Sequence, residues 1–373
     1  MRRRTLSYNV RARMQIATQP RLFARYPSLS EQLAWMPLAS VPTPVEKMTA
    51  IADWLSRDDV WMKRDDLISP LYGGNKVRRY EYVLAEAKRL GRTRIVTVGG
   101  LASTQVMATA LFGKAHGFKV SAVYFDQPAT RFMQEALLVD ATAGAEMIYG
   151  GGYLRTIWKT IGAYRREPGA YFIPPGAANP IANLGYVDAM FELAEQVERG
   201  EMPRPDLIVL PTGSSGTLAA LGIGARLLGW NTEIVGVRIT LKIATNALTV
   251  GAVARGTWKF MRAKSKELSA QAIDPIRYRL LHSALGRGYG YPTDAAVAAM
   301  PMVQRLLGCS GEVTYSAKAL VGLRELAQSE ATRGKTILFW NTLSSQRPDV
   351  SGVDPFTVLP PDFHRFFRGE PQV

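Results

Sequence analysis

Cysteine and histidine are scarce in this 373-residue chain, and it has no long apolar run. Its one cysteine, Cys309, excludes an internal disulfide and suits a reducing compartment, so we expect a cytoplasmic protein. The three histidines, His116, His282 and His364, show no metal-ligand spacing, which argues against a metal site. No stretch approaches the ~18–20 apolar residues of a membrane span, and no apolar secretion segment opens the chain. A cysteine nucleophile or a Ser/His/Asp hydrolase stays open without a local motif, so a cofactor is the favoured source of reactivity.

Acidic residues are missing from residues 1–25, which hold seven arginines of a chain whose net charge is +15. We predict that this segment is a solvated basic tail, with no specific nucleic-acid partner and no membrane. The remaining charges are scattered, without a basic helix or interleaved aromatic residues. Weak binding to nucleic acid or to an anionic membrane surface, docking on a partner subunit and an organelle transit peptide stay open as alternatives.

Short apolar runs alternate with helical patterns along the rest of the chain. Strands are predicted at 94–100, 119–125, 145–151, 170–174, 206–212, 233–239 and 335–342. One helix is predicted to begin near Lys76. Six others are predicted to span 103–116, 130–143, 180–198, 217–229, 293–307 and 316–330. This alternation is typical of α/β proteins with parallel-rich sheets flanked by helices. We predict a small α/β domain at 81–200, inserted into a larger domain formed by 26–80 and 201–373.

The stretch "SPLYGGNKVRRY" (69–80) places two glycines and Asn75 immediately before Lys76, at the start of an amphipathic helix. Glycine lets the backbone approach another group closely. The helix dipole opposes positive charge at this end, so we expect Lys76 to favour the neutral amine that attacks carbonyl groups. The alternative is a turn followed by an ordinary solvated lysine.

Two other strand-to-helix junctions are rich in small polar residues. "LPTGSSGTL" (210–218) predicts a phosphate cradle made from helix-start amides and from these residues: Thr212, Gly213, Ser214, Ser215, Gly216 and Thr217. It matches neither the Walker A loop nor G-x-G-x-x-G, and a plain tight turn is the alternative. "GGLASTQ" (99–105) predicts that Ser103 caps a helix and, with Thr104, can hold a carboxylate. Tyr289 and Tyr315, each ahead of a helix start, are either walls of a cleft or core residues.

Taken together, these stretches resemble the pyridoxal-phosphate enzymes that include D-cysteine desulfhydrase and 1-aminocyclopropane-1-carboxylate (ACC) deaminase. The similarity extends from about 38 to 342, and "KRDDLISPLYGGNK" (63–76) is its most specific segment. "IPPGAANPIANLGYVDA" (173–189) and "YGYP" (289–292) add to it. The resemblance implies a two-domain fold type II α/β enzyme, similar to the tryptophan synthase β-subunit, and usually a homodimer.

The resemblance also implies roles for individual residues. Lys76 would form the Schiff base with pyridoxal 5'-phosphate, with Asn75 and the glycines letting the cofactor lie against backbone. The 212–217 loop would bind its phosphate. Ser103, Tyr289 and Tyr315 match active-site residues of the family and, with Thr104 and Gln105, would bind the substrate. Ser316 falls at the pyridine nitrogen, where the deaminases carry glutamate and the desulfhydrases threonine.

Three departures bear on the substrate. Thr104 stands where the family has an asparagine that contacts the cofactor ring, Gln105 is similar to the deaminases, and "WNTLSS" (340–345) replaces a motif with two glycines. Because a hydroxyl at 316 holds a pyridinium proton less well than a carboxylate, Ser316 favours elimination over ring opening. We therefore expect a deaminating lyase for a small amino acid, similar to D-cysteine desulfhydrase. ACC deaminase-type ring opening and a non-catalytic cofactor-binding homologue are the alternatives.

Overall fold

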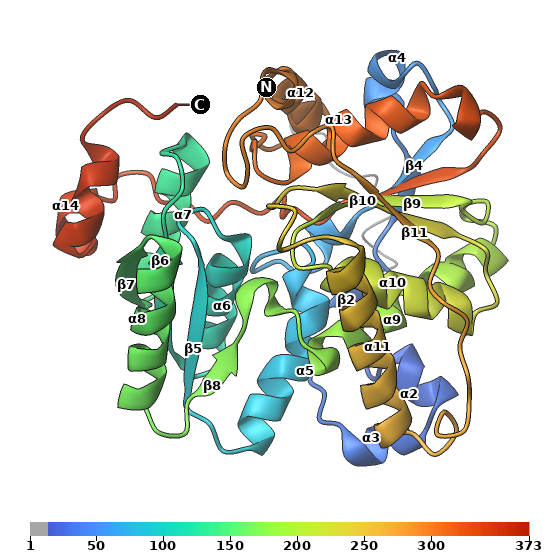
Figure 1. Cartoon of the computed structure of the whole chain (residues 1–373), viewed down its shortest axis with the longest axis horizontal. Helices are drawn as coiled ribbons and strands as arrows, with labels where there is room; N and C mark the ends of the chain where they lie inside the picture. The colour runs from blue at the N-terminus through green and yellow to red at the C-terminus, as the bar shows by residue number, and fades with distance from the viewer. Residues whose placement is uncertain (1–13, 373) are drawn as a thin grey trace. The chain divides into compact units, whose positions relative to one another are not determined.

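A computed structural model describes residues 14–372, which divide into two compact units (Figure 1). Within the described residues, unit 1 comprises 14–83 together with 178–346, and unit 2 comprises 84–177 together with 347–372. All seven predicted strands and the six bounded helices are found, with ends shifted by a few residues. The α/β prediction is therefore confirmed at the level of individual elements.

Unit 1 contains a six-stranded sheet in the order β11-β10-β9-β12-β4-β3. Every neighbouring pair is parallel except β3 with β4. Its strands are β3 (Val45–Lys47), β4 (Val60–Lys63), β9 (Leu207–Thr212), β10 (Glu233–Arg238), β11 (Tyr278–Leu281) and β12 (Ile337–Trp340). Because parallel strands end at the same edge, the segments that follow β4, β9, β10 and β12 meet at the carboxyl edge of this sheet.

Helices cover both faces of the unit 1 sheet. The unit's helices are α2 (Arg21–Arg25), α3 (Ser28–Gln32), α4 (Ala52–Leu55), the start of α5 (Lys76–Arg89), α9 (Pro180–Glu198), α10 (Gly216–Leu227), α11 (Ala247–Lys264), α12 (Asp294–Leu307) and α13 (Ser316–Ala327). A Cβ added at Gly236 of β10 would meet Leu218 of α10, whereas one at Gly322 of α13 would meet Val237. Since neighbouring strand residues point to opposite faces, α10 and α13 lie on opposite sides of β10.

Unit 2 contains a four-stranded, all-parallel sheet in the order β7-β6-β5-β8. Its elements are β5 (Arg94–Gly100), α6 (Thr104–Ala115), β6 (Lys119–Phe125), α7 (Arg131–Thr142), β7 (Glu146–Gly151), α8 (Tyr153–Arg166), β8 (Tyr171–Ile173) and α14 (Pro355–Val358). Val96, Val98 and Val123 form an apolar cluster with Ala163 of α8. A Cβ at Gly99 would instead meet Val106 of α6, which places α6 on the other face.

The compact units differ from the predicted domain boundaries in two places. Residues 178–200, predicted for the small domain, belong to unit 1, where α9 packs on α2, α10 and α11. Residues 347–373, predicted for the large domain, belong to unit 2, where Phe363 packs edge-to-face on Tyr124 and Tyr149. The role of each domain in binding cofactor stays a prediction.

The predicted solvated tail is folded where the structure describes it. Residues 1–13 lie outside the described range, but β1 (Gln15–Ile16) pairs with β2 (Ser40–Val41). In α2, Leu22 is fully buried and Arg21 donates to Glu195 of α9 at 2.7 Å. The composition of this segment did not indicate that its apolar residues pack in unit 1. Within residues 14–372, no helix combines the length and apolar character needed to cross a bilayer.

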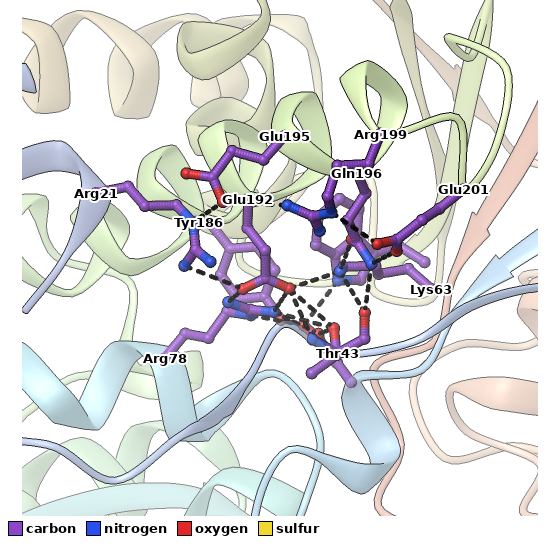
Figure 2. A network of polar contacts seen from close by, with 12 residues as sticks. Arg21, Thr43, Lys63, Arg78, Tyr186, Glu192, Glu195, Gln196, Arg199 and Glu201 are labelled. Carbon is purple, nitrogen blue, oxygen red and sulfur yellow. Dashed lines mark hydrogen bonds and ion pairs between the residues drawn. The ribbon is translucent and has the colours of Figure 1, made fainter. Parts of the chain in front are cut away.

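A buried network of charged side chains joins β4, α5 and α9 (Figure 2). Glu192 of α9 accepts from Lys63 of β4 at 2.5 Å and from Arg78 of α5 at 2.9 Å. Arg78 also contacts Asp65 at 2.9 Å. Burial would raise the pKa of Glu192, but Lys63 and Arg78 hold it well below its usual range. Burial would lower the pKa of Arg78, but Asp65 and Glu192 raise it above the usual value.

We predict that Glu192→Gln destabilises unit 1 strongly, because Lys63 and Arg78 lose the charge that compensates their burial. The expected loss is about 3–5 kcal/mol in the free energy of unfolding, measured by urea denaturation at pH 7. The control is Glu195→Gln, whose partly exposed pair with Arg21 should contribute less than about 1 kcal/mol. Because folding lowers the pKa of Glu192, the difference between wild type and Glu192→Gln should shrink as the pH falls below 4.5. Equal losses in the two variants would contradict the prediction.

Candidate active site

Lys76 is the first residue of α5 and is only 8% exposed. Burial, followed by the positive charge of Arg79, lowers the pKa of its amine from 10.5 to about 7. This direction agrees with the predicted preference for a neutral amine, although its causes are burial and a neighbouring cation rather than the helix dipole. Its Nζ donates to the side-chain oxygen of Asn75 at 2.9 Å.

The two glycines before Lys76 pack against the chain's own backbone, and the prediction that they also let a cofactor lie there stays a prediction. A Cβ at Gly73 would collide with the backbone carbonyl of Asp66, and one at Gly74 would lie 2.5 Å from the backbone oxygen of Thr342. Gly74 also has a φ of 84°, which side-chain-bearing residues rarely adopt. Close packing of this loop on the chain's own backbone therefore requires both glycines.

The "TLSS" segment (342–345) supports the same loop. The hydroxyl of Ser344 accepts from the backbone N–H of Gly73 at 2.8 Å, and the carbonyl of Thr342 accepts from that of Asn75 at 3.2 Å. Ser345 donates to the carbonyl of Asp66 at 3.2 Å. The serines of "TLSS" are hydrogen-bonded parts of the structure that holds Lys76.

The 212–217 loop links β9 to α10 and is connected to Lys76 through side chains. Thr217 accepts from Asn75 at 3.4 Å, and Asn75 in turn accepts from Lys76. Thr217 also accepts from Arg79 at 2.8 Å. Ser215 stands in the left-handed region with φ 63°, and its buried hydroxyl has no hydrogen-bond partner. No side chain caps the first turn of α10.

Tyr289 and Tyr315 lie together in unit 1. Their hydroxyls share a hydrogen bond, and their rings meet edge-to-face with centroids 5.8 Å apart. Lys318, on the same helix start as Tyr315, donates to the carbonyls of Leu285 and Gly288 at 2.8 and 3.0 Å. Because Gly288 immediately precedes Tyr289 and Leu285 lies four residues before it, Lys318 fixes the loop that carries Tyr289.

Ser316 is paired with a carboxylate that sequence reasoning missed. Its hydroxyl donates to Glu312 at 2.8 Å, and Glu312 also accepts from the backbone N–H groups of Thr314, Tyr315 and Ser316. Glu312 is 2% exposed. With its proton directed to Glu312, the Ser316 oxygen is left as an acceptor. A buried carboxylate therefore lies four residues before Ser316, ahead of the start of α13.

The predicted substrate-binding residues Ser103, Thr104 and Gln105 belong to unit 2. Ser103 caps α6 as predicted, accepting from the N–H of Val106 at 3.3 Å. The N–H of Ala102 is bound by Gln127 and that of Ser103 by Gly100. The amide of Thr104 lies at the open end of the helix, where an anion can bind. The amide nitrogen of Gln105 points inward, donating to Thr97 at 2.7 Å.

Comparison with known proteins identifies the family. Residues 37–342 match the model of the family described as "Pyridoxal-phosphate dependent enzyme". The chain belongs to this family. Its cofactor is accordingly pyridoxal phosphate, and its architecture is the fold type II architecture that the sequence predicted.

Relatives within the family carry the two names that the sequence suggested. A Thermotoga maritima protein named as a candidate 1-aminocyclopropane-1-carboxylate deaminase is 30% identical over 311 residues, which cover 82% of this chain and 94% of the relative. A D-cysteine desulfhydrase of Serratia proteamaculans is 29% identical, covering 84% and 96%. A crystal structure titled as an ACC deaminase homologue superposes with a TM-score of 0.72 at 27% identity, covering 92% of this chain and all of that one.

The residues of unit 1 fit the cofactor that the family implies. A phosphate group requires donors, and the buried hydroxyl of Ser215 lacks a partner beside the uncapped start of α10. An aldehyde requires a neutral amine, which the lowered pKa of Lys76 provides near pH 7. These two features are joined through Asn75 and Thr217.

Sequence reasoning did not single out three charged residues of unit 1. Arg79 lies one turn after Lys76 on the same helix face, a spacing that could have revealed it. Glu312 precedes a helix start, where an acid is a capping signal. Arg238 has no sequence signal, because its place depends on strand pairing.

We predict that the Lys76 amine of the cofactor-free protein titrates near pH 7. The measurement is the 13Cε shift of labelled lysine as a function of pH, with the signal assigned by Lys76→Arg. Arg79→Met should raise the midpoint, because a neighbouring positive charge is removed. Since folding lowers this pKa, the folded chain binds fewer protons than the unfolded chain between pH 7 and 10.5, and Lys76 makes stability rise with pH there. A midpoint near pH 10.5 would mean that the Lys76 amine is charged at neutral pH and would contradict the prediction.

Proposed function

We propose that this chain deaminates a small amino acid of D configuration by β-elimination, releasing a 2-oxo acid and ammonia. With D-cysteine, one water is consumed and sulfide leaves from Cβ. The observation that carries the proposal is Lys76: a buried amine with a pKa of about 7, hydrogen-bonded toward the 212–217 loop, in a chain of this family. The names of its relatives support the substrate class.

The residues that would hold the cofactor come mainly from unit 1. Lys76 would anchor it, Asn75 and Thr104 would contact it, Ser316 would accept from its ring nitrogen, and the loop from Thr212 to Thr217 would bind its phosphate. Bound pyridoxal phosphate supplies an aldehyde that condenses with amines and a ring that withdraws electrons from the amino-acid Cα.

The chain's own groups supply binding and proton transfer. The Lys76 amine, uncharged over much of the physiological range, takes the Cα proton. The helix start formed by Ser103, Thr104 and Gln105 would bind the substrate carboxylate. Because Tyr289 and Tyr315 share a hydrogen bond, the proton of one can be donated to the leaving group while the other stabilises the oxygen left behind.

The choice between elimination and ring opening rests on Ser316. A hydroxyl alone disfavours ring opening, but Glu312 draws the hydroxyl proton to itself and strengthens the acceptor at this position. Gln105, which is similar to the deaminases, also favours ring opening. We retain elimination because a departing group relieves the need for strong ring protonation. ACC ring opening is the alternative that the experiment must separate.

By resemblance, we also propose that the protein is a cytoplasmic homodimer. Sedimentation equilibrium should give twice the chain mass of 41.1 kDa. A mass of one chain would exclude the dimer.

The function is tested by screening D- and L-amino acids and ACC. We expect purified protein to be yellow, to release 2-oxo acid and ammonia from D-cysteine, and to release sulfide in equal amount. Borohydride should fix the cofactor on the peptide that contains Lys76, and Lys76→Ala should abolish turnover. Lys88→Ala, which changes an exposed lysine of the same helix, is the control.

Other outcomes of this screen would overturn parts of the proposal. Turnover of ACC above every D-amino acid would replace elimination by ring opening. Turnover of L-amino acids alone would overturn the stereochemistry. Bound cofactor without turnover of any compound would indicate a non-catalytic binding protein, and labelling of another lysine would remove Lys76 from its role.

Tyr315→Phe should lower kcat about 100-fold or more with little change in KM, because proton transfer in the transition state is lost. The measurement is steady-state kinetics with the substrate found in the screen. Tyr291→Phe is the matched control, since Tyr291 lies in the Tyr289 loop and is 37% exposed. A Tyr315→Phe enzyme with unchanged kcat would leave Tyr315 without a catalytic role.

A further inference from the structure

Arg238 ends β10 at the carboxyl edge of the unit 1 sheet. Its Cα is paired with that of Thr212, the last residue of β9, so the two strands are about 4.8 Å apart there. Gly236, two residues earlier, faces α10. By strand alternation, the Arg238 side chain lies on the same face as α10 and at the same edge as the start of that helix.

The guanidinium of Arg238 is buried without a partner. The residue is 7% exposed, and its Nε and Nη1 are buried without a hydrogen bond. No ion pair involves Arg238 within residues 14–372. The buried arginines Arg64 and Arg78, by contrast, contact Asp66, Asp65 and Glu192 at 2.8–2.9 Å. A buried cation without an acid is unfavourable, so an anion that binds here would compensate it.

Other features at this edge also favour an anion. The Ser215 hydroxyl lacks a partner, and the first turn of α10, a 12-residue helix, has no side-chain cap. Partial burial, Arg238 and Lys242 all lower the pKa of His282, which indicates a positive potential around β10 and β11. A helix start, a buried hydroxyl and a forked guanidinium together are suited to a phosphate monoester.

We propose that Arg238 binds the phosphate group of the cofactor and neutralises its second negative charge. This inference rests on the assignment of the 212–217 loop to that phosphate, and it adds a residue that the loop motif does not contain. A substrate carboxylate is the competing ligand. The pairing of Arg238 with Thr212 favours the phosphate, because that pairing places the Cα of Arg238 next to the first residue of the loop, with its side chain on the face of α10.

The experiment compares the affinity of cofactor-free protein for pyridoxal phosphate and for pyridoxal, which lacks the phosphate. Arg238→Met should weaken binding of pyridoxal phosphate roughly 10- to 100-fold and leave that of pyridoxal unchanged. Arg238→Lys, which keeps the charge but loses the fork, should fall between. Arg279→Met is the matched control, because Arg279 of neighbouring β11 pairs with Glu233 instead.

A second readout is the 31P resonance of the bound phosphate. It should be constant from pH 5.5 to 8 in the wild type, since Arg238 holds the dianion. In Arg238→Met and Arg238→Lys the 31P resonance should change with pH, and the change should be larger in Arg238→Met. Its midpoint should approach about 6, the ordinary second pKa of a phosphate monoester.

The possible results separate this proposal from the proposed function. Equal affinity for pyridoxal phosphate in wild type and Arg238→Met would overturn it. A parallel loss for pyridoxal would assign Arg238 a structural role, and a raised KM with unchanged cofactor affinity would assign it to the substrate carboxylate. A wild type that binds pyridoxal phosphate no better than pyridoxal would overturn the loop assignment as well. If the wild type turned over no compound of the screen while Arg238→Met still lost affinity for pyridoxal phosphate selectively, the proposed function alone would be overturned.

Discussion

The buried ion cluster around Glu192 is the interaction on which the site in unit 1 depends. It ties Arg78, two residues after Lys76, to α9 and to Asp65. Asp65 also accepts from Tyr186 and Trp340, both at 2.7 Å. Through these bonds the end of β4, the end of β12 and the first turn of α5 are held in one arrangement. The "KRDD" run is therefore structural, although it lies in the segment most specific to the family.

Adjacent arginines of α5 have opposite electrostatic roles. Arg78 is compensated by two acids, which keep its pKa above the ordinary value. Arg79 donates to the neutral groups of Asn183 and Thr217, and burial lowers its pKa to about 10. Its positive charge therefore acts on Lys76 and helps to keep the amine neutral. The helix thus carries one buried arginine whose charge is compensated by acids, Arg78, followed by one whose charge acts on Lys76, Arg79.

Sequence patterns gave the local structure and missed what depends on distant partners. Alternation of apolar runs predicted seven strands, and the position of Ser103 predicted its cap. Strand β11 and helices α8 and α11 were not predicted, and in α8 the apolar residues, among them Leu154 and Trp158, recur at helical spacing on an exposed face. Lys63 and Glu192 are 129 residues apart, so no local pattern could reveal their pair. The same limit applies to Arg238, whereas Glu312 and Arg79 were within reach of helix-spacing rules.

The charges of unit 1 also bear on the serine at position 316, which we propose to lie at the ring nitrogen of the cofactor. A glutamate at 316 would place its charge beside Glu312, whose carboxylate already binds three backbone amides at the start of α13. Two carboxylates at that distance would repel each other, and one would tend to take up a proton. A serine avoids this conflict and transmits the influence of Glu312 through one hydrogen bond. At its proposed position by the ring nitrogen, this acceptor would be intermediate between a free hydroxyl and a carboxylate, and it would suit elimination from a substrate whose leaving group departs readily.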